Sequence, residues 1–170
     1  QQGNIDGQVT LVISNKPDAK GLDIAKTYGV TTAVCPTEPD IIKELAKAKP
    51  DLICLAGYMK ICSEKLIHNY KHKIMNIHPA LLPAFPGLHV QKKALEYGVK
   101  YTGCTVHFVD EGCDTGPIIM QAVVPVLDND TEDTLSSRIL QEEHRIYSEA
   151  IQLFAQGRLK IEGRIVHVQK

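Results

Sequence analysis

The sequence predicts an α/β fold, in which a mostly parallel, twisted sheet has helices on both of its faces. Short apolar runs of strand length alternate with longer amphipathic segments, and the runs are almost continuously apolar, as in strands buried on both faces. A chain of 170 residues with 44% hydrophobic residues has the size and apolar content of one ordinary globular domain. No internal repeat or low-complexity linker divides it, so residues 1–170 are predicted to form a single domain.

The first half of the chain contains four predicted strands and three predicted helices. The helices are indicated by apolar stripes at helical spacing, by Ser63 as a capping residue, and by the stop residues Gly29 and Pro50. The strands are β-branched or aliphatic runs that end at small or polar residues. The predicted strands cover residues 9–14, 31–34, 51–56 and 73–78, and the predicted helices cover residues 21–28, 38–48 and 63–70.

The second half begins with a segment that cannot be regular structure, because residues 79–87 contain three prolines. Gly98 and Gly157 are predicted to end two helices, and Asp130 is predicted to cap the longer one. The predicted elements are helices at 90–97 and 130–156, strands at 103–109 and 117–126 with a loop at 110–116 between them, and a terminal hairpin at 160–168.

Charge and composition argue against several classes of protein. The 19 basic and 20 acidic residues give a formal net charge of −1, so we expect no nucleic-acid partner. No apolar run approaches the ~18 residues that span a bilayer, and no signal sequence is visible. We therefore expect a cytoplasmic protein without a membrane partner. The five cysteines include no Cys-x-x-Cys pair and suit reduced thiols, and no side-chain cluster has metal-ligand spacing, so no metal is predicted.

Asn76 and His78 are the first candidates for catalysis. They lie two residues apart at the end of a predicted strand, so both side chains leave the same face, roughly 7 Å apart at ~3.3 Å per residue. An Asn amide can stabilise an oxyanion, and an imidazole can donate or accept a proton near neutral pH. The alternative is that two polar residues simply end a strand, but the rigid proline segment that follows favours a functional site.

Asp114 is the third candidate, because it lies in the predicted loop between two strands, with Gly112 and Gly116 on either side. Its carboxylate can orient His78 and favour the imidazolium form. The alternative is a plain turn, in which Asp beside Gly is common. Thr105 and His107 share one face of the preceding strand, and we assign them a supporting role at most.

The region after the strand at 51–56 is a candidate for ligand binding. Exposed backbone there can hydrogen-bond a planar heterocycle, with Leu55, Ile61 and Leu66 as apolar walls, although an ordinary βα loop is the alternative. The first predicted strand is not followed by a glycine-rich phosphate loop, which argues against a dinucleotide-binding protein.

Four linked motifs carry a resemblance to a known family. They are Asn-Ile-His-Pro-Ala-Leu-Leu-Pro at 76–83, Phe-Pro-Gly-Leu-His at 85–89, Gly-Cys-Thr-Val-His-Phe-Val at 103–109, and Asp-Thr-Gly-Pro-Ile-Ile at 114–119 followed by Gln121. From residue 14 to about residue 159, the chain resembles the formyltransferase family that uses 10-formyltetrahydrofolate. The second motif and the Ser-Asn-Lys at 14–16 are similar to the branch that acts on glycinamide ribonucleotide in purine biosynthesis.

The resemblance implies a Rossmann-like fold and formyl transfer from 10-formyltetrahydrofolate, the co-substrate, to the amine of glycinamide ribonucleotide, without a metal. It implies that Asn76 stabilises the oxyanion, that His78 acts as the acid–base group, and that Asp114 holds His78. Thr105 and His107 would support an ordered water beside them. The resemblance assigns folate binding to Leu55, Met59, Lys60, Ile61, Cys62, Asp110 and Glu111, and ribonucleotide binding to Pro79, Gly87 and Glu143.

The sequence departs from the family pattern in one respect, and two alternative functions stay open. Family members begin with a strand, a phosphate-gripping loop and a helix, and this sequence starts after that unit. The single domain is therefore expected to lack the phosphate loop. The alternatives are a formyltetrahydrofolate hydrolase, in which water replaces the amine, and a catalytically silent folate-binding fragment. The expected assembly is a monomer or a homodimer.

Overall fold

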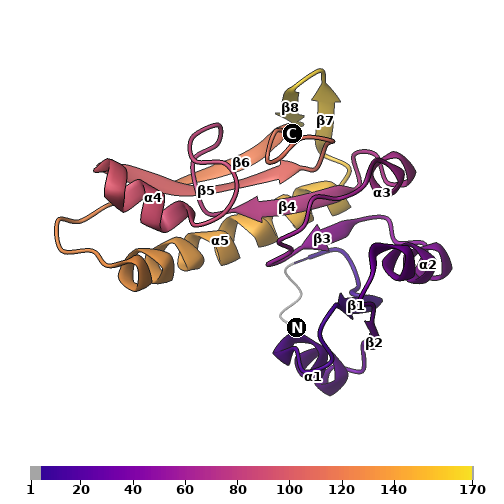
Figure 1. Cartoon of the computed structure of the whole chain (residues 1–170). Helices are drawn as coiled ribbons and strands as arrows, with labels where there is room; N and C mark the ends of the chain where they lie inside the picture. Colours follow the sequence, from indigo (N-terminus) through magenta and orange to yellow (C-terminus); the bar gives the residue numbers. More distant parts are fainter. Residues whose placement is uncertain (1–4, 170) are drawn as a thin grey trace. The chain divides into compact units, whose positions relative to one another are not determined.

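The computed structural model describes residues 5–169 (Figure 1). Contacts between residues divide them into two compact units. One unit comprises residues 7–51, and the other comprises residues 52–169 together with residues 5 and 6. The prediction that both units belong to one domain stays a prediction.

The smaller unit is a βαβα arrangement around a two-stranded parallel sheet. Its strands pair directly, from Leu11 opposite Thr31 to Ser14 opposite Val34. Leu22 and Ala25, which lie on one face at helical spacing, are the buried residues of the first helix. The elements are β1 (Leu11–Ser14), α1 (Lys20–Thr27), β2 (Thr31–Val34) and α2 (Glu38–Ala48).

The larger unit is built on a six-stranded sheet with the strand order β3-β4-β5-β6-β8-β7. Helices accompany this sheet, so the predicted α/β class is confirmed (Figure 1). Its elements are β3 (Ile53–Leu55), α3 (Glu64–Asn69), β4 (Ile74–His78), α4 (Val90–Tyr97), β5 (Tyr101–Phe108), β6 (Ile118–Pro125), α5 (Glu132–Ala155), β7 (Leu159–Glu162) and β8 (Ile165–Val168).

The pairing within this sheet is mixed, which corrects the expectation of a mostly parallel sheet. β3 pairs with β4 and β6 pairs with β8 in parallel, whereas β4–β5, β5–β6 and β7–β8 are antiparallel. For the antiparallel β5–β6 pair, the physical reason is connection length. Only residues 109–117 separate β5 from β6, and a loop that short returns the chain beside itself in the opposite direction.

Helix α5 covers one face of the sheet and forms most of the hydrophobic core with it (Figure 1). Leu135, Ile139, Ile146 and Ala150, all on this helix, are buried at helical spacing. They belong to one cluster with Met75 of β4, with Cys104, Val106 and Phe108 of β5, and with Ile119, Ala122 and Val124 of β6. Because Met75 lies on the core side of β4, the neighbouring Asn76 points to the opposite face of the sheet.

The cap of α5 differs from the predicted one by a single residue. Thr131 caps the helix, since its side chain accepts a hydrogen bond from the Thr134 amide, and Thr134 bonds back to the Thr131 amide. Asp130, which the sequence suggested as the cap, instead accepts from the Leu127 amide and pairs with Arg138 at 2.7 Å. Asp130 and Arg138 are not neighbours in the sequence, so the rules for helix caps, which consider only nearby residues, do not reveal their ion pair.

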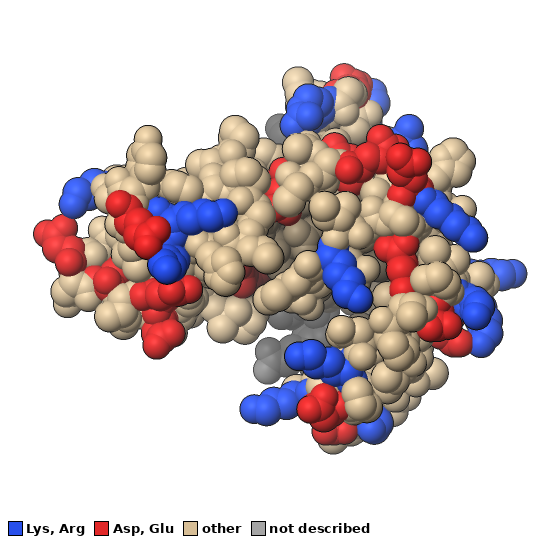
Figure 2. All heavy atoms as spheres, viewed as in Figure 1, with Lys and Arg blue, Asp and Glu red and all other residues tan. Residues whose placement is uncertain are grey.

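Charged side chains of both signs are interspersed on the face shown in Figure 2. Among residues 5–169, no helix is both long enough and apolar enough to cross a membrane. The five cysteines are free thiols, as the sequence predicts.

Candidate active site

The candidate site lies on β4 and β5, on the face of the sheet away from α5. In the register of these strands, Asn76 is opposite His107, and His78 is opposite Thr105. Directly opposite residues of an antiparallel pair place their side chains on the same face. The sequence-based expectation that Asn76 and His78 share a face is therefore met, and β5 adds two further polar residues beside them.

His78 is buried, with a fractional exposure of 4%. Its Nε2 lies 2.8 Å from the carbonyl oxygen of Phe85, and its Nδ1 lies 3.3 Å from Oδ2 of Asp114. A carbonyl oxygen only accepts, so Nε2 carries a hydrogen and donates it. Burial lowers the pKa of His78 below its ordinary value, while the Phe85 carbonyl and the Asp114 carboxylate oppose that effect.

Asp114 meets His78 from the loop between β5 and β6. Its Oδ2 accepts from the Gly87 amide at 2.9 Å, and its Oδ1 lies 3.7 Å from Nε2 of His107. The pKa of Asp114 lies well below the ordinary carboxyl value. The nearby His107 ring is the largest cause, and the Gly87 amide and His78 stabilise the carboxylate further against the cost of burial. Asp114 is therefore ionised near neutral pH.

His107 connects Asn76 to this pair. Its Nδ1 donates to the Phe108 carbonyl at 2.9 Å, so Nε2 is an acceptor in the neutral ring and a donor toward Asp114 in the imidazolium. Asn76 donates to that Nε2 from Nδ2 at 3.3 Å, which fixes the orientation of the amide and leaves its second N–H for another acceptor. Asn76, His107, Asp114 and His78 thus form a continuous chain of side-chain contacts, in which His107 has a larger part than its predicted supporting role.

Thr105 is fully buried, and its hydroxyl is hydrogen-bonded to the proline segment 79–87 rather than to the Asn76–His107–Asp114–His78 contacts. Its hydroxyl donates to the Ala80 carbonyl at 2.6 Å and accepts from the Leu82 amide at 3.1 Å. Gln121 donates to the same hydroxyl at 2.9 Å. The sequence named Gln121 in a motif but gave it no role. The signal that could have identified it is a polar residue on a strand, in register with a buried Thr.

The predicted folate-binding residues lie at the end of β3 and in the loop at 110–116. Met59 and Ile61, with fractional exposures of 77% and 70%, are among the most exposed large apolar side chains of the described residues, whereas Cys62 is buried. Asp110 accepts from the Gly112 amide and the Thr115 hydroxyl, so its loop is held in one conformation. Leu55 is half-buried, and Lys60 and Glu111 are exposed. That these residues bind a folate stays a prediction.

The predicted ribonucleotide-binding residues lie in two parts of the chain, the proline segment 79–87 and helix α5. Pro79 directly follows His78, and Gly87 donates its amide to Asp114, so both touch the candidate site through the chain or a hydrogen bond. Glu143 is half-buried on α5, and burial raises the pKa of its carboxyl. Its role in binding also stays a prediction.

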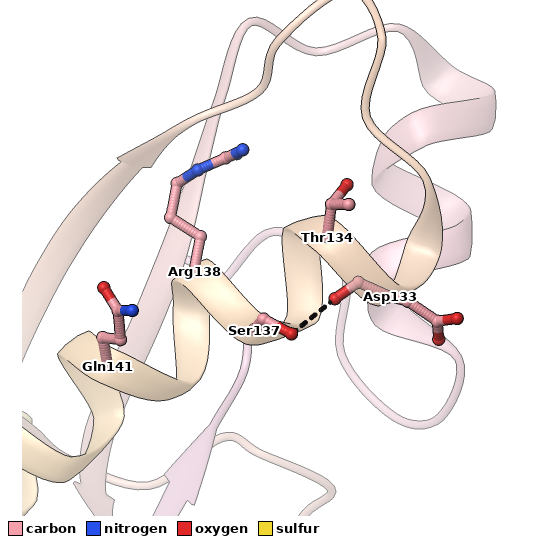
Figure 3. Close-up of a pocket in the computed structure, with 5 residues that line it drawn as sticks. All are labelled: Asp133, Thr134, Ser137, Arg138 and Gln141. Carbon is pink, nitrogen blue, oxygen red and sulfur yellow. Dashed lines mark hydrogen bonds between the residues drawn. The ribbon is translucent and has the colours of Figure 1, made fainter.

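A separate open pocket lies at the start of α5 (Figure 3). It is lined by Asp133, Thr134, Ser137, Arg138 and Gln141. The Ser137 hydroxyl donates to the Asp133 carbonyl, and Arg138 is bonded to the Pro125 carbonyl and to Asp130. Ser137 and Arg138 therefore have hydrogen-bond partners, and the pocket contains no member of the Asn76–His107–Asp114–His78 chain.

This four-residue chain has the parts needed for a group transfer at a carbonyl carbon. Asn76 offers an oriented N–H donor for developing negative charge, and the His78 imidazole beside the ionised Asp114 carboxylate can accept or donate a proton. Among residues 5–169, no three His, Cys, Asp or Glu side chains are grouped so that they could hold a metal ion.

Comparisons with known proteins place this chain in a family. A family model described as formyl transferase matches residues 1–151. The chain is 42% identical over 166 residues to phosphoribosylglycinamide formyltransferase from Escherichia coli strain K12, which covers 92% of this chain and 78% of that protein. It is 44% identical over 170 residues to the trifunctional purine biosynthetic protein adenosine-3 of Drosophila melanogaster, covering 95% of this chain but only 13% of that longer protein.

A solved structure agrees with the sequence comparisons. The crystal structure of glycinamide ribonucleotide transformylase 1 from Symbiobacterium toebii superposes with a TM-score of 0.95 at 50% identity, and the match covers 99% of this chain and 84% of that one. The match of the family model over most of the sequence, together with these relatives, shows that the chain belongs to the formyl transferase family.

Proposed function

We propose that this chain transfers a formyl group from 10-formyltetrahydrofolate to the amine of glycinamide ribonucleotide, a step of purine biosynthesis. The observation that carries the proposal is the chain of contacts Asn76–His107–Asp114–His78 on one face of the sheet. The names of the relatives, phosphoribosylglycinamide formyltransferase and glycinamide ribonucleotide transformylase, support this choice of substrates.

The reaction forms one bond and breaks another. The amine nitrogen attacks the formyl carbon, negative charge develops on the formyl oxygen, and the bond between the formyl carbon and folate N10 then breaks. The amine loses one proton and N10 gains one, so the net proton count is unchanged. Two tasks fall to the protein: stabilising the oxygen and moving the proton.

Asn76 is assigned to the oxygen. One of its Nδ2 hydrogens is bonded to His107, so the other is held in a fixed direction and can donate to the formyl oxygen. A donor that is already oriented needs no reorganisation as the charge develops, and removing one such donor costs about 10²–10³ in kcat.

His78 and Asp114 are assigned to the proton. An imidazolium can donate to both the Phe85 carbonyl and the Asp114 carboxylate, whereas a neutral imidazole can donate to only one of them. Burial disfavours the charged form more than these two acceptors favour it, so the pKa of His78 is lowered and the neutral imidazole, which can accept a proton, is favoured near neutral pH. A group poised in this way can accept a proton from the amine and return it to N10.

The placement of the substrates extends this proposal. The exposed apolar side chains of Met59 and Ile61 suit the wall of a folate site, together with Leu55, and the backbone at Lys60, Cys62, Asp110 and Glu111 suits the polar edge of a pterin. Pro79, Gly87 and Glu143 are proposed to contact the ribonucleotide. Their support is the resemblance of the motifs, combined with the hydrogen bond that links Gly87 to Asp114.

The test is an assay of the purified chain with 10-formyltetrahydrofolate, with and without glycinamide ribonucleotide. We expect a formylated ribonucleotide and an equal amount of tetrahydrofolate, and we expect Asn76→Ala and His78→Ala to lower kcat by at least about 100-fold. Asn69→Ala and His68→Ala are matched controls, because both residues are exposed on α3. Thermal melting of every variant checks that the fold is retained.

Each other outcome contradicts the proposal in a definite way. Release of tetrahydrofolate at the same rate without the amine would identify a hydrolase. Folate binding by calorimetry without turnover would identify a silent folate-binding protein. Full activity in Asn76→Ala or His78→Ala would refute the assigned mechanism while leaving the reaction itself intact.

A further inference from the structure

We propose that Gln121 is a positioning residue for formyl transfer, which acts by holding the proline segment 79–87 where it meets His78 and Asp114. This inference rests on the function proposed above. Gln121 lies on β6 in register with Thr105 of β5, so both side chains stand on the face of the sheet that faces away from α5.

Gln121 makes two hydrogen bonds with its amide nitrogen. Nε2 donates to the Leu82 carbonyl at 3.0 Å and to the Thr105 hydroxyl at 2.9 Å. The Leu82 carbonyl can only accept, so the amide nitrogen must face it. The reverse orientation would place two oxygens against each other, and the position therefore requires a donor.

The Thr105 hydroxyl has no hydrogen-bonding capacity left over. It donates its single hydrogen to the Ala80 carbonyl at 2.6 Å, and it accepts from the Leu82 amide at 3.1 Å and from Gln121. Together, Thr105 and Gln121 bind three backbone groups of the proline segment. We call this pair and its bonds the Thr105–Gln121 clamp.

The far end of the same segment supplies one partner to each member of the proton-transfer pair. The Phe85 carbonyl accepts from His78 at 2.8 Å, and the Gly87 amide donates to Asp114 at 2.9 Å. Phe85 has a φ of +52°, in the left-handed region that costs energy for a residue with a side chain. Such a conformation persists only when the surrounding contacts hold it. The clamp supplies such contacts at Leu82, three residues before Phe85.

Releasing the clamp should therefore act on His78 at a distance. The groups that face His78 are the Asp114 carboxylate, the His107 imidazole, the Lys93 ammonium and the Phe85 carbonyl. The Phe85 carbonyl raises the pKa of His78, so a segment that moves away from His78 should lower that pKa.

The experiment compares Gln121→Met, which keeps the length and volume of the side chain but removes the donors, with Val123→Ala. Val123 is the matched control, since it stands on the same face of β6 two residues further along and is 61% exposed. We expect Gln121→Met to lower kcat by about 10- to 100-fold with KM for both substrates changed by less than about threefold. We expect Val123→Ala to resemble the wild type.

The second readout is the titration of the His78 ring by NMR, which a purely structural loss of stability would not move. We expect the pKa of His78 to be lower in Gln121→Met than in the wild type and unchanged in Val123→Ala. If Gln121→Met does not fold, Gln121→Asn serves the same test, because it keeps an amide that is one methylene too short to reach both acceptors.

Wild-type kcat and an unchanged His78 titration in a folded Gln121 variant would overturn the inference. A uniform loss of activity with an unchanged His78 titration would also overturn it. If the wild type itself transfers no formyl group, the proposed function fails, and the NMR titration still decides whether Gln121 positions His78.

Discussion

Asp114 occupies a backbone conformation that is uncommon for any residue except glycine, with a φ of +56°. Asp is among the residues that tolerate this conformation, which is why Asp beside Gly is also common in plain turns. The structure distinguishes the two interpretations of the sequence. The loop does turn here, but the carboxylate faces inward with 14% exposure and contacts His78, His107 and the Gly87 amide. A solvent-facing turn residue would have none of these partners.

The Asp114→Asn variant tests whether this carboxylate sets the protonation of His78. Asp114 raises the pKa of His78 against the effect of burial, so its loss should lower that pKa further. We expect kcat to fall by about 10²–10⁴. The His78 ring is titrated by NMR in both proteins, with exposed His68 in the same sample as an internal reference. A His78 pKa that stays constant or rises would contradict the assigned role of Asp114.

At the scale of the element, the β5–β6 hairpin determines where Asp114 can lie. Gly116 lies at the end of the loop that carries Asp114, and its backbone packs against that of Phe108. A Cβ atom built on Gly116 would lie 1.7 Å from the Phe108 carbonyl oxygen. This approach is possible only without a side chain, which explains the Gly in the Asp-Thr-Gly motif in physical terms.

The Gly116→Ala variant should therefore shift the loop that carries Asp114. The neighbouring atoms are backbone and cannot move aside cheaply, so we expect about 1–3 kcal/mol of destabilisation. We expect kcat to fall more than 10-fold as well, because Asp114 and His78 lose their alignment. Gly21→Ala is the control, since a Cβ there meets nothing within 4 Å. Melting curves and steady-state kinetics give the two readouts, and unchanged values for Gly116→Ala would refute the packing argument.

The elements also show where local sequence rules succeed and where they end. Apolar periodicity predicted the strands and helices with only small differences at their ends, as with β5, predicted at 103–109 and observed at Tyr101–Phe108. Ser63 caps α3 as expected, because a capping bond is local. The mixed pairing of the sheet and the Asp130–Arg138 pair were missed, since both depend on how the chain folds back on itself.

At the scale of the whole molecule, the candidate site also consists partly of residues that the sequence predicts and partly of groups that it does not. Motifs identified Asn76, His78 and Asp114, and the structure brings them together through direct contacts or through His107. The Phe85 carbonyl and the Gln121 amide were not given roles. A backbone carbonyl has no sequence signature, and the Gln121 contacts depend on the register of β5 with β6.

Two carboxylates with depressed pKa values, Asp114 and Asp130, lie in the larger unit and should govern its stability in acid. The Arg138 guanidinium is the main cause for Asp130. A carboxyl whose pKa is lower in the folded than in the unfolded state stabilises the folded protein at pH values above its unfolded-state pKa of about 3.9. That stability is lost as the pH falls through the folded value.

We therefore expect these two groups to change the melting temperature little between pH 7 and about pH 5, and to lower it steeply below about pH 4. Asp130→Asn should melt at a lower temperature than the wild type at pH 7 and should lose less on further acidification, because one of the two linked protonations has been removed. Asp128→Asn is the matched control, since Asp128 is 95% exposed in its pair with Lys100. The chain contains no tryptophan, so far-UV circular dichroism is the appropriate probe. Parallel curves for the wild type and Asp130→Asn from pH 7 to pH 3 would show that the Asp130–Arg138 pair does not contribute to acid unfolding.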